Sequence, residues 1–403
     1  PDELSKQIPI TNPFLKELME SFLSAGGRKG RSGKGVRIDF DELGINEVVD
    51  LLDNSNMEAV VRDFGDKNPL EDPVIHFYEL FLHEYDSEVR MQRGVFYTPR
   101  PVVSFIVRSV DKILRAEYGL EDGLADTTTW SEIVKRNEEL KIPKGLNPDD
   151  PFVQILDPAT GTGTFLVEVI DLIHKTMVAR WKDEGNSSKR IEQLWNDYVP
   201  KYLLTRLHGY ELLMAPYAIA HMKIGLKLFE TGYDFGSNER THIYLTNALE
   251  PAQDFSDSFS FMIPALAHEA KAVSQIKTNQ LFTIVIGNPP YAYESANNGE
   301  WICQLIKNYY FVDGSPLGER NPRGLQDDYV KFIRFAQATL SETGIGVLGF
   351  ITNHGYLSNP TFRGMRQSLK DEFAKIYAID LHGNSKRNEC APDGTKDENV
   401  FDI

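Results

Sequence analysis

The chain has 403 residues, of which 41% are hydrophobic and 25% charged, the composition of an ordinary globular protein. Its formal net charge of −16 argues against tight, sequence-independent binding to nucleic acid, because affinity for phosphates comes from Lys and Arg. That charge still allows a nucleic-acid enzyme with a local basic surface. The only cysteines, Cys303 and Cys390, exclude a disulfide framework and a cysteine-rich zinc site and fit a reducing cytoplasm. No apolar run reaches membrane-spanning length.

Residues 1–88 show helical periodicity with breaks, which predicts an N-terminal helical region. The glycine-rich loop at residues 26–37 resembles a phosphate loop only superficially. Arg28 stands where the first glycine is required, and Gly35 stands where Ser or Thr is required. We interpret it as a flexible loop, with phosphate contact through its backbone as the alternative.

A short apolar run is followed by the turn sequence DPATGTGTF at residues 157–165 and then by an amphipathic helical pattern. Strand, glycine turn and helix begin a Rossmann-type unit, in which Gly161 and Gly163 let a ligand approach the backbone. Leu166 occupies the place of the third small residue of the dinucleotide fingerprint. Asp157 at the end of the strand suits a cationic ligand better than a pyrophosphate. A purely structural glycine turn is the alternative.

Two further strands are predicted to end in polar residues. The strand at 207–211 ends in Glu211, at the position where Rossmann-type folds bind ribose hydroxyls. The strand at 243–249 carries Asn247 near its end. Because the carboxyl ends of parallel strands meet at one edge of a sheet, these side chains are expected near the glycine turn.

The sequence Asn288-Pro289-Pro290-Tyr291 follows a buried apolar strand at residues 282–287. Two consecutive prolines fix two backbone φ angles and remove two N–H donors. The carbonyls of Asn288 and Pro289 are therefore free and rigidly placed beside an amide side chain and an aromatic ring. Such a site can accept hydrogen bonds from a planar amino group and stack on its ring.

The remaining chain continues the alternation of helices and strands. Helices are predicted at residues 329–340 and 362–373, and strands at residues 345–351 and 376–381. The whole pattern predicts an α/β fold with a parallel sheet.

Together these motifs resemble the S-adenosylmethionine-dependent N6-adenine DNA methyltransferases of the gamma class. The order is FYTP at 96–99, DPATGTGTF, GYE at 209–211, and NPPY. The chain is most similar to the methyltransferase part of type ISP (single-polypeptide, type I-like) restriction-modification enzymes, through the stretches MQRGVFYTPRPVVSFIVRSVD, GEW and LQDDYVKFIRFAQ. The resemblance implies a Rossmann-like doubly wound methyltransferase sheet over residues 89–403, after an N-terminal helical region at residues 1–88.

The resemblance implies that the Asn288 side-chain oxygen and the Pro289 carbonyl accept hydrogen bonds from the N6 amino group of a flipped-out adenine. Tyr291 would stack on that base, and Pro290 completes the rigid catalytic motif. No general base is obvious in the sequence, and no metal site is expected.

The implied cofactor is S-adenosyl-L-methionine. Its methionine part would be held by Asp157 and the glycine turn, its carboxylate by Thr98 and its ribose by Glu211. Asn247 would contact its adenine, at a position that is often Asp in the family. The predicted cofactor-binding residues are Tyr97, Thr98, Asp157, Ala159, Gly161, Gly163, Phe165, Glu211, Asn247 and Ala248.

The expected partner is double-stranded DNA. The chain starts at Pro1 and ends in an apolar run, which suggests a piece of a longer polypeptide that also carries nuclease, translocase and target-recognition parts. Modification of a protein glutamine or an RNA base is the alternative within methyl transfer, and a non-catalytic cofactor-binding scaffold of a defence complex is the alternative outside it. An NAD-linked oxidoreductase is disfavoured, because the third glycine is lacking and no proton-transfer histidine follows a strand near the turn.

Overall fold

The computed structural model describes residues 98–137, 139–236, 239–253, 264–383, 389–397 and 399–400, together with Phe14, Lys16 and Glu17. The predictions for Tyr97, for most of the N-terminal helical region and for the glycine-rich loop lie outside the described residues. Among the described helices, none combines the length and apolar character that crossing a membrane requires.

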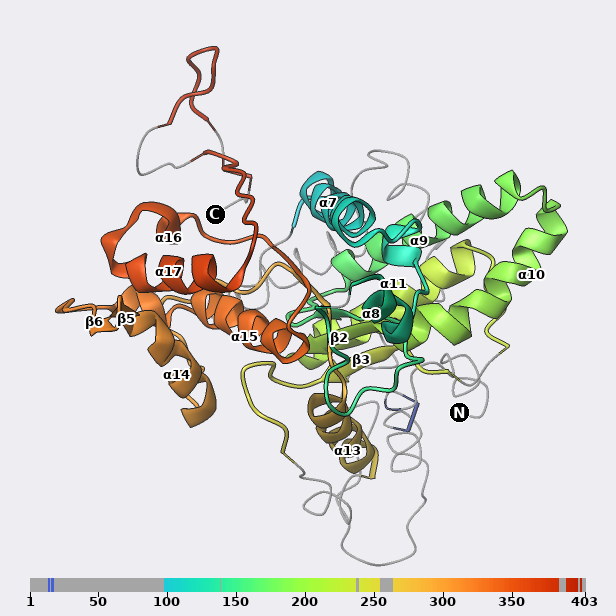
Figure 1. Cartoon of the computed structure of the whole chain (residues 1–403), viewed down its shortest axis with the longest axis horizontal. Helices are drawn as coiled ribbons and strands as arrows, with labels where there is room; N and C mark the ends of the chain where they lie inside the picture. The colour runs from blue at the N-terminus through green and yellow to red at the C-terminus, as the bar shows by residue number, and fades with distance from the viewer. Residues whose placement is uncertain are drawn as a thin grey trace, which may run out of the picture.

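A parallel sheet of five strands forms the centre of the molecule (Figure 1), as the sequence predicts. Its strands are β1 Ile155–Asp157, β2 Leu207–Glu211, β3 His242–Leu245, β4 Ile284–Gly287 and β7 Val347–Phe350. The spatial order is β3-β2-β1-β4-β7, and each neighbouring pair is parallel. A separate antiparallel hairpin joins β5 Phe311–Val312 to β6 Ser315–Pro316.

Helices alternate with these strands along the chain. The α-helices are α7 Arg100–Tyr118, α8 Trp130–Arg136, α9 Thr164–Asp183, α10 Ser188–Tyr198, α11 Met214–Glu230, α13 Pro264–Asn279, α14 Glu300–Ile306, α15 Asp328–Thr343, α16 Gly355–Ser358 and α17 Arg363–Glu372. Shorter helical turns are η1 Gly123–Ala125, η2 Val199–Leu203, η3 Leu204–Arg206, η4 Lys307–Tyr310, η5 Arg323–Gln326 and η6 Pro360–Phe362.

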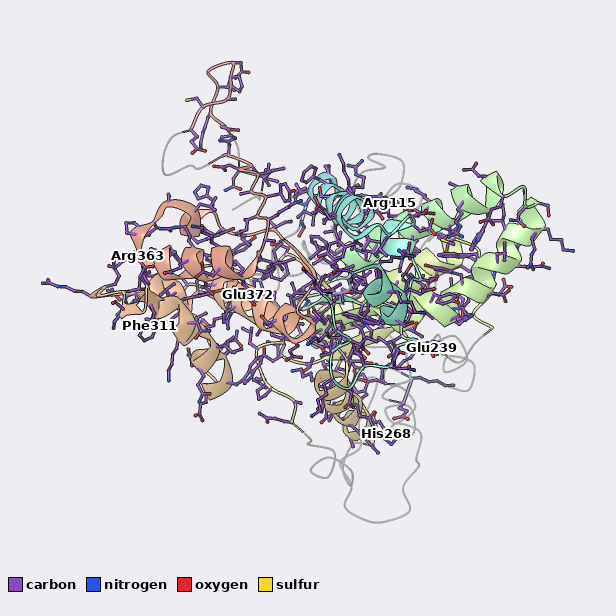
Figure 2. The ribbon with its side chains drawn as sticks, in the orientation of Figure 1. Arg115, Glu239, His268, Phe311, Arg363 and Glu372 are labelled. Atoms are coloured by element: carbon purple, nitrogen blue, oxygen red, sulfur yellow. The ribbon has the colours of Figure 1, made fainter. Side chains whose placement is uncertain are left out.

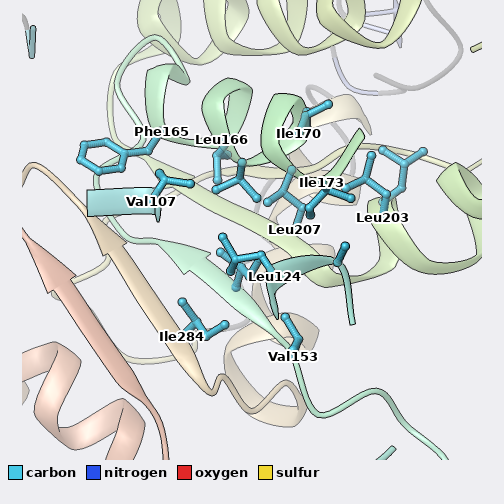
Figure 3. Packing of buried hydrophobic residues seen from close by; sticks show 14 of the residues in the cluster. Val107, Leu124, Val153, Phe165, Leu166, Ile170, Ile173, Leu203, Leu207 and Ile284 are labelled. Carbon is cyan, nitrogen blue, oxygen red and sulfur yellow. The ribbon is translucent and has the colours of Figure 1, made fainter. Parts of the chain in front are cut away.

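Both faces of the sheet are buried, which explains why its strands read as continuous apolar runs. Successive side chains of a strand point to opposite faces. Ile284 and Ile286 accordingly pack in the cluster that includes residues of α7, α9 and α11, whereas Val285 packs with residues of α15. Figure 3 shows the first cluster, with Leu166, Ile170 and Ile173 of α9 packed beside Leu207 and near Ile284 of the sheet.

The strand order reverses direction between β1 and β4, which lie side by side with Ile155 opposite Ile284. From β1 the chain builds outward to β2 and β3 on one side, and from β4 to β7 on the other. In open α/β sheets a crevice forms at this reversal, outside the carboxyl ends of the strands. Asp157 and Asn288 follow these two central strands, so the topology places the two predicted half-sites next to each other.

One predicted strand is wrong. Residues 376–381 form no strand, and Ile376, Tyr377 and Ile379 are exposed. Among the described residues β7 pairs only with β4, so the segment runs near the sheet without joining it. A short apolar run such as this one is typical of a buried strand, but a strand also needs a neighbour with which to exchange hydrogen bonds.

An open groove of 2690 Å³ lies between α7, β7 and residues 374–383. Its volume exceeds the roughly 300–1,000 Å³ that is typical of small-molecule sites. Of the predicted catalytic and cofactor-binding residues, Tyr291 alone lines it. The groove therefore reaches the NPPY motif at Tyr291, whereas the glycine turn and the strand-end acids do not line it.

Candidate active site

The glycine turn connects β1 to α9 in the predicted manner. Gly161 and Gly163 adopt positive φ angles of 56° and 83°, and Gly163 is the N-terminal cap of α9. A Cβ added to Gly161 would meet nothing within 4 Å, so the backbone there borders open space. The turn therefore leaves room for a ligand to lie against the backbone.

Asp157, at the end of β1, is almost fully buried, with 1% of its surface exposed. Its Oδ1 accepts the Ala159 N–H at 3.1 Å, and no ion pair to it occurs among the described residues. Burial raises the pKa of Asp157 to about 8, with a further contribution from the nearby Glu211 carboxylate. The end of β4 approaches closely, because a Cβ on Gly287 would lie 2.7 Å from Asp157 Oδ1.

Glu211, at the end of β2, holds the glycine turn from the other side. Its Oε2 accepts the Gly161 N–H and its Oε1 accepts the Leu213 N–H, both at 2.8 Å. Burial raises the pKa of Glu211 to about 7, although these backbone hydrogen bonds favour the ionised form. Two buried carboxylates therefore share one crevice, which is an arrangement that a positively charged ligand would stabilise.

The Asn288 amide is held at both ends. Its Nδ2 donates to Thr98 Oγ1 at 2.9 Å, and its Oδ1 accepts from the Tyr291 hydroxyl at 2.7 Å. Thr98 and Asn288 are 190 residues apart in sequence, so the fold brings the first and last of the predicted motifs into contact. An amide oxygen has two lone pairs, and Oδ1 can therefore take a second donor.

Tyr291 lies between Asn288 and α15. Burial raises the pKa of its hydroxyl, so this group stays protonated and remains a donor. Its ring lies 6.2 Å from that of Tyr329, which lies 6.4 Å from that of Tyr356. An aromatic row thus leads from the catalytic motif to the segment after β7.

Asn247 follows β3, and its side chain is largely engaged within the protein. Its Nδ2 donates to Glu250 Oε1 at 3.1 Å and to Asn297 Oδ1 at 2.9 Å. Its Oδ1 accepts the Leu249 N–H at 3.0 Å. Both amide hydrogens are used, so donation from Asn247 to a ligand ring nitrogen would have to displace a partner. Only one lone pair of Oδ1 stays available.

The other predicted cofactor residues take supporting positions. Ala159 donates its N–H to Asp157, while Phe165 and Ala248 are buried in the clusters on the two faces of the sheet. Among the described residues, no group of three or more His, Cys, Asp or Glu side chains could hold a metal ion.

Three residues beside the site were not predicted, namely Asn297, Asp328 and Lys331. They connect the segment after Tyr291 to α15 and to Asn247. The available signal was the placement of Asp328 and Lys331 on the first turn of the helix, next to the apolar residues Tyr329, Val330, Phe332 and Ile333.

Several known proteins are similar to this chain. The chain is 26% identical over 236 residues to the type II methyltransferase M.BstVI of Geobacillus stearothermophilus, covering 58% of this chain and 34% of that protein. The structure of a DrdV–DNA complex matches with a TM-score of 0.54 and 28% identity, covering 78% of this chain and 26% of that one. A DNA-bound, nuclease-deleted type ISP restriction-modification enzyme, LlaGI, matches with a TM-score of 0.61 and 23% identity, covering 91% and 25%.

The chain thus spans about a third or less of the length of these relatives. The family model described as N-6 DNA Methylase matches residues 70–375, which contain every predicted catalytic and cofactor-binding residue. The chain belongs to the N-6 DNA methylase family.

Proposed function

We propose that this chain transfers a methyl group from S-adenosyl-L-methionine to the N6 amino group of an adenine flipped out of double-stranded DNA. The observation that carries the proposal is the Asn288 amide, held by Thr98 and Tyr291 after the strand that neighbours Asp157. A rigid acceptor for an amino group and a pair of buried acids for a cation thus flank one crevice.

On the base side, Asn288 Oδ1 and the Pro289 carbonyl would accept the two N6 hydrogens, leaving the nitrogen lone pair free to react. Flipping the adenine out of the duplex costs a few kcal/mol of stacking and pairing. Tyr291 offers a ring on which the extruded base can stack. The chain would catalyse the reaction mainly by aligning the reacting atoms.

On the cofactor side, the residues present fit a positively charged ligand, because Asp157 and Glu211 are buried without a described cationic partner. Asp157 would face the charged methionine part, Glu211 the ribose and Asn247 Oδ1 the adenine amino group. Thr98 accepts from Asn288, so its own hydroxyl proton can be donated to the ligand carboxylate. When bound, the cofactor supplies a methyl carbon on a positively charged sulfur.

The relatives suggest the wider setting. A type II methyltransferase, a DrdV–DNA complex and a type ISP restriction-modification enzyme in complex with a DNA substrate mimic each match this chain over only part of their own length. We propose that this chain is the modification part of a cytoplasmic restriction-modification enzyme, with nuclease, translocase and target-recognition parts on the same full-length polypeptide.

The test is transfer of labelled methyl groups to DNA by the full-length protein carrying Asn288→Ala. Loss of the acceptor should lower transfer by about 100-fold or more. Binding of S-adenosylhomocysteine should stay within about threefold, because the cofactor acids are untouched. The exposed Asn321→Ala serves as the matched control and should methylate normally. Normal methylation by Asn288→Ala would refute the proposal.

The alternatives are separated by the same label. Incorporation into protein or RNA but not DNA would support a glutamine or RNA methyltransferase. Tight binding of S-adenosylhomocysteine with no transfer to any substrate would support a non-catalytic scaffold.

A further inference from the structure

A fully buried lysine lies beside the site. Lys331, on the first turn of α15, has 0% of its surface exposed, and burial lowers its pKa. Its ammonium donates to Ser295 Oγ at 2.9 Å, to the Asn297 carbonyl at 2.6 Å and to Asn298 Oδ1 at 3.4 Å. All three acceptors belong to the segment that follows Tyr291. The charge is therefore committed to holding this segment.

The same turn of α15 holds the segment a second time. The buried carboxylate of Asp328 accepts from Ser295 Oγ and, at 3.0 Å, from Asn297 Nδ2. Its neighbour Asp327 accepts the Ala292 N–H at 3.2 Å, while the Asp328 N–H donates to the Ala292 carbonyl at 3.3 Å. Residues 292–298, called the tether segment below, are thus fixed at both ends.

The donor and acceptor directions in this network also fix the orientation of the Asn247 amide. The Asp328 carboxylate accepts from the Nδ2 end of the Asn297 amide. The Oδ1 of Asn297 must then point the other way, and there it accepts from Asn247 Nδ2 at 2.9 Å. Asn247 is left with one lone pair on Oδ1 as its remaining capacity. A charge on α15 thus helps to decide which atom Asn247 can offer to a ligand.

We propose that Asp328 and Lys331 are positioning residues: Asp328 sets the hydrogen-bond polarity of the cofactor site through the Asn297 amide, and Lys331 holds the tether segment in the place that lets Asn297 reach Asn247. Together they couple this site to the base-binding motif through the tether segment. The proposal rests on the proposed function, in which Asn247 faces the cofactor adenine. It implies selectivity for a 6-aminopurine, which can donate to Oδ1, over a 6-oxopurine, which offers only an acceptor there.

Arg334 provides a matched control on the same helix. It is also buried, but its Nε donates to the Leu305 carbonyl at 3.1 Å and its guanidinium lies 3.6 Å from Glu372 of α17. Figure 2 labels Glu372, the partner on α17. These contacts hold α14 and α17 and do not involve the tether segment. Removing either cation should weaken the fold, but only Lys331 should affect the cofactor site.

The experiment compares Lys331→Met, Asn297→Ala and Arg334→Met in the full-length protein. Binding of S-adenosylhomocysteine and of its inosine analogue is measured by calorimetry, and amide hydrogen exchange of the tether segment is measured without ligand. Lys331→Met should raise the dissociation constant of S-adenosylhomocysteine about tenfold, the order expected for one lost hydrogen bond. The preference of this variant for S-adenosylhomocysteine over the inosine analogue should fall by a similar factor. Amide hydrogen exchange in the tether segment should accelerate.

Asn297 is half-buried, so Asn297→Ala should fold, and it keeps the backbone carbonyl that Lys331 contacts. Asn297→Ala should lose its preference for S-adenosylhomocysteine over the inosine analogue. Hydrogen exchange in the tether segment should change less than it does in Lys331→Met. Arg334→Met should lower thermal stability and leave both dissociation constants within about twofold.

Unchanged ligand preference in Lys331→Met and Asn297→Ala would overturn the proposal, as would an equal loss in Arg334→Met. If the unaltered protein binds no S-adenosylhomocysteine, the proposed function fails. Hydrogen exchange then still decides whether Lys331 holds the tether segment.

Discussion

The two halves of the crevice differ in how far the protein itself satisfies their polar groups. On the base side, the Asn288 amide has a partner at each end, and both partners are neutral. On the cofactor side, Asp157 and Glu211 are buried acids whose described partners are backbone N–H groups. The base side can therefore stand alone, whereas the cofactor side is under electrostatic strain that a cationic ligand relieves.

The largest effect is expected on cofactor affinity, when one of these buried acids is removed. Asp157→Asn should lower the affinity for S-adenosyl-L-methionine about 100-fold, because a buried counter-charge is lost. The same change should leave thermal stability equal or higher, since an isolated buried carboxylate destabilises a fold. Calorimetric titration and thermal unfolding measure the two quantities.

Asp111→Asn is the matched control. Asp111 is also buried, but it pairs with Arg115 at 2.7 Å and accepts the Leu124 N–H at 2.8 Å. Its replacement should destabilise the fold and leave cofactor affinity unchanged. If Asp157→Asn destabilised the fold as much as Asp111→Asn, the contrast between the two halves would be wrong.

The second prediction concerns pH. The pKa of Asp157 is raised to about 8 in the fold from an ordinary value of 3.8. Between pH 3.8 and about 8, the folded chain therefore binds more protons than the unfolded chain. The stability that this group contributes is lost as pH rises through about 8. A cation needs the ionised acid, so affinity for S-adenosyl-L-methionine should fall about fivefold from pH 8 to pH 7. Calorimetry at several pH values checks this, and Asp157→Asn should flatten the profile.

The third prediction separates the pH dependence caused by Asp157 from that caused by buried histidines away from the crevice. Burial lowers the pKa of His208 to about 3 and of His242 to about 4, and their rings stack at 5.0 Å across β2 and β3. Neutral histidine is favoured in the fold, so stability is present above pH 6.5 and is lost as pH falls toward these values. Urea unfolding should show a loss of about 2 kcal/mol per histidine between pH 7 and pH 5.

His208→Phe, beside Phe282, should reduce that loss without changing cofactor affinity at pH 8. A His208→Phe protein that kept the full acid sensitivity would show that other groups cause it.

The smallest effect is expected on the self-satisfied base side. Tyr291→Phe keeps the ring and removes the hydroxyl that donates to Asn288 Oδ1. Because the amide keeps its Thr98 contact, methyl transfer should change by less than about tenfold and stability by about 1 kcal/mol. Steady-state kinetics with labelled cofactor measures the change. A loss as large as that of Asn288→Ala would mean that the hydroxyl itself is essential.

Prediction from sequence succeeds where the signal is local. About ten residues of sequence are enough to recognise a buried strand, a glycine turn or a strand-end acid such as Asp157 or Glu211. The reason is that parallel strands and tight turns restrict the residue types they accept. The segment 376–381 has the apolar composition of a strand, but pairing depends on a neighbouring strand that this local pattern does not contain.

The polar network around Lys331, by contrast, has no signal that is local in the sequence. Its members come from three parts of the chain, 247, 295–298 and 328–331, and each is an ordinary polar residue in its own surroundings. Only the folded arrangement shows that the Asn247 amide is mostly engaged. The sequence therefore predicts Asn247 as a cofactor-binding residue but could not say which of its atoms remained available.

The outer edge of β7 has a practical consequence for anyone who purifies this chain. Among the described residues no strand pairs with the outer edge of β7, and such an edge exposes backbone groups that can pair with another molecule. Residues 376–381 nearby present exposed apolar side chains. Concentrated solutions are thus expected to scatter light as molecules associate through this edge. Ile379→Lys, on a side chain that is 64% exposed, should raise the concentration at which this begins.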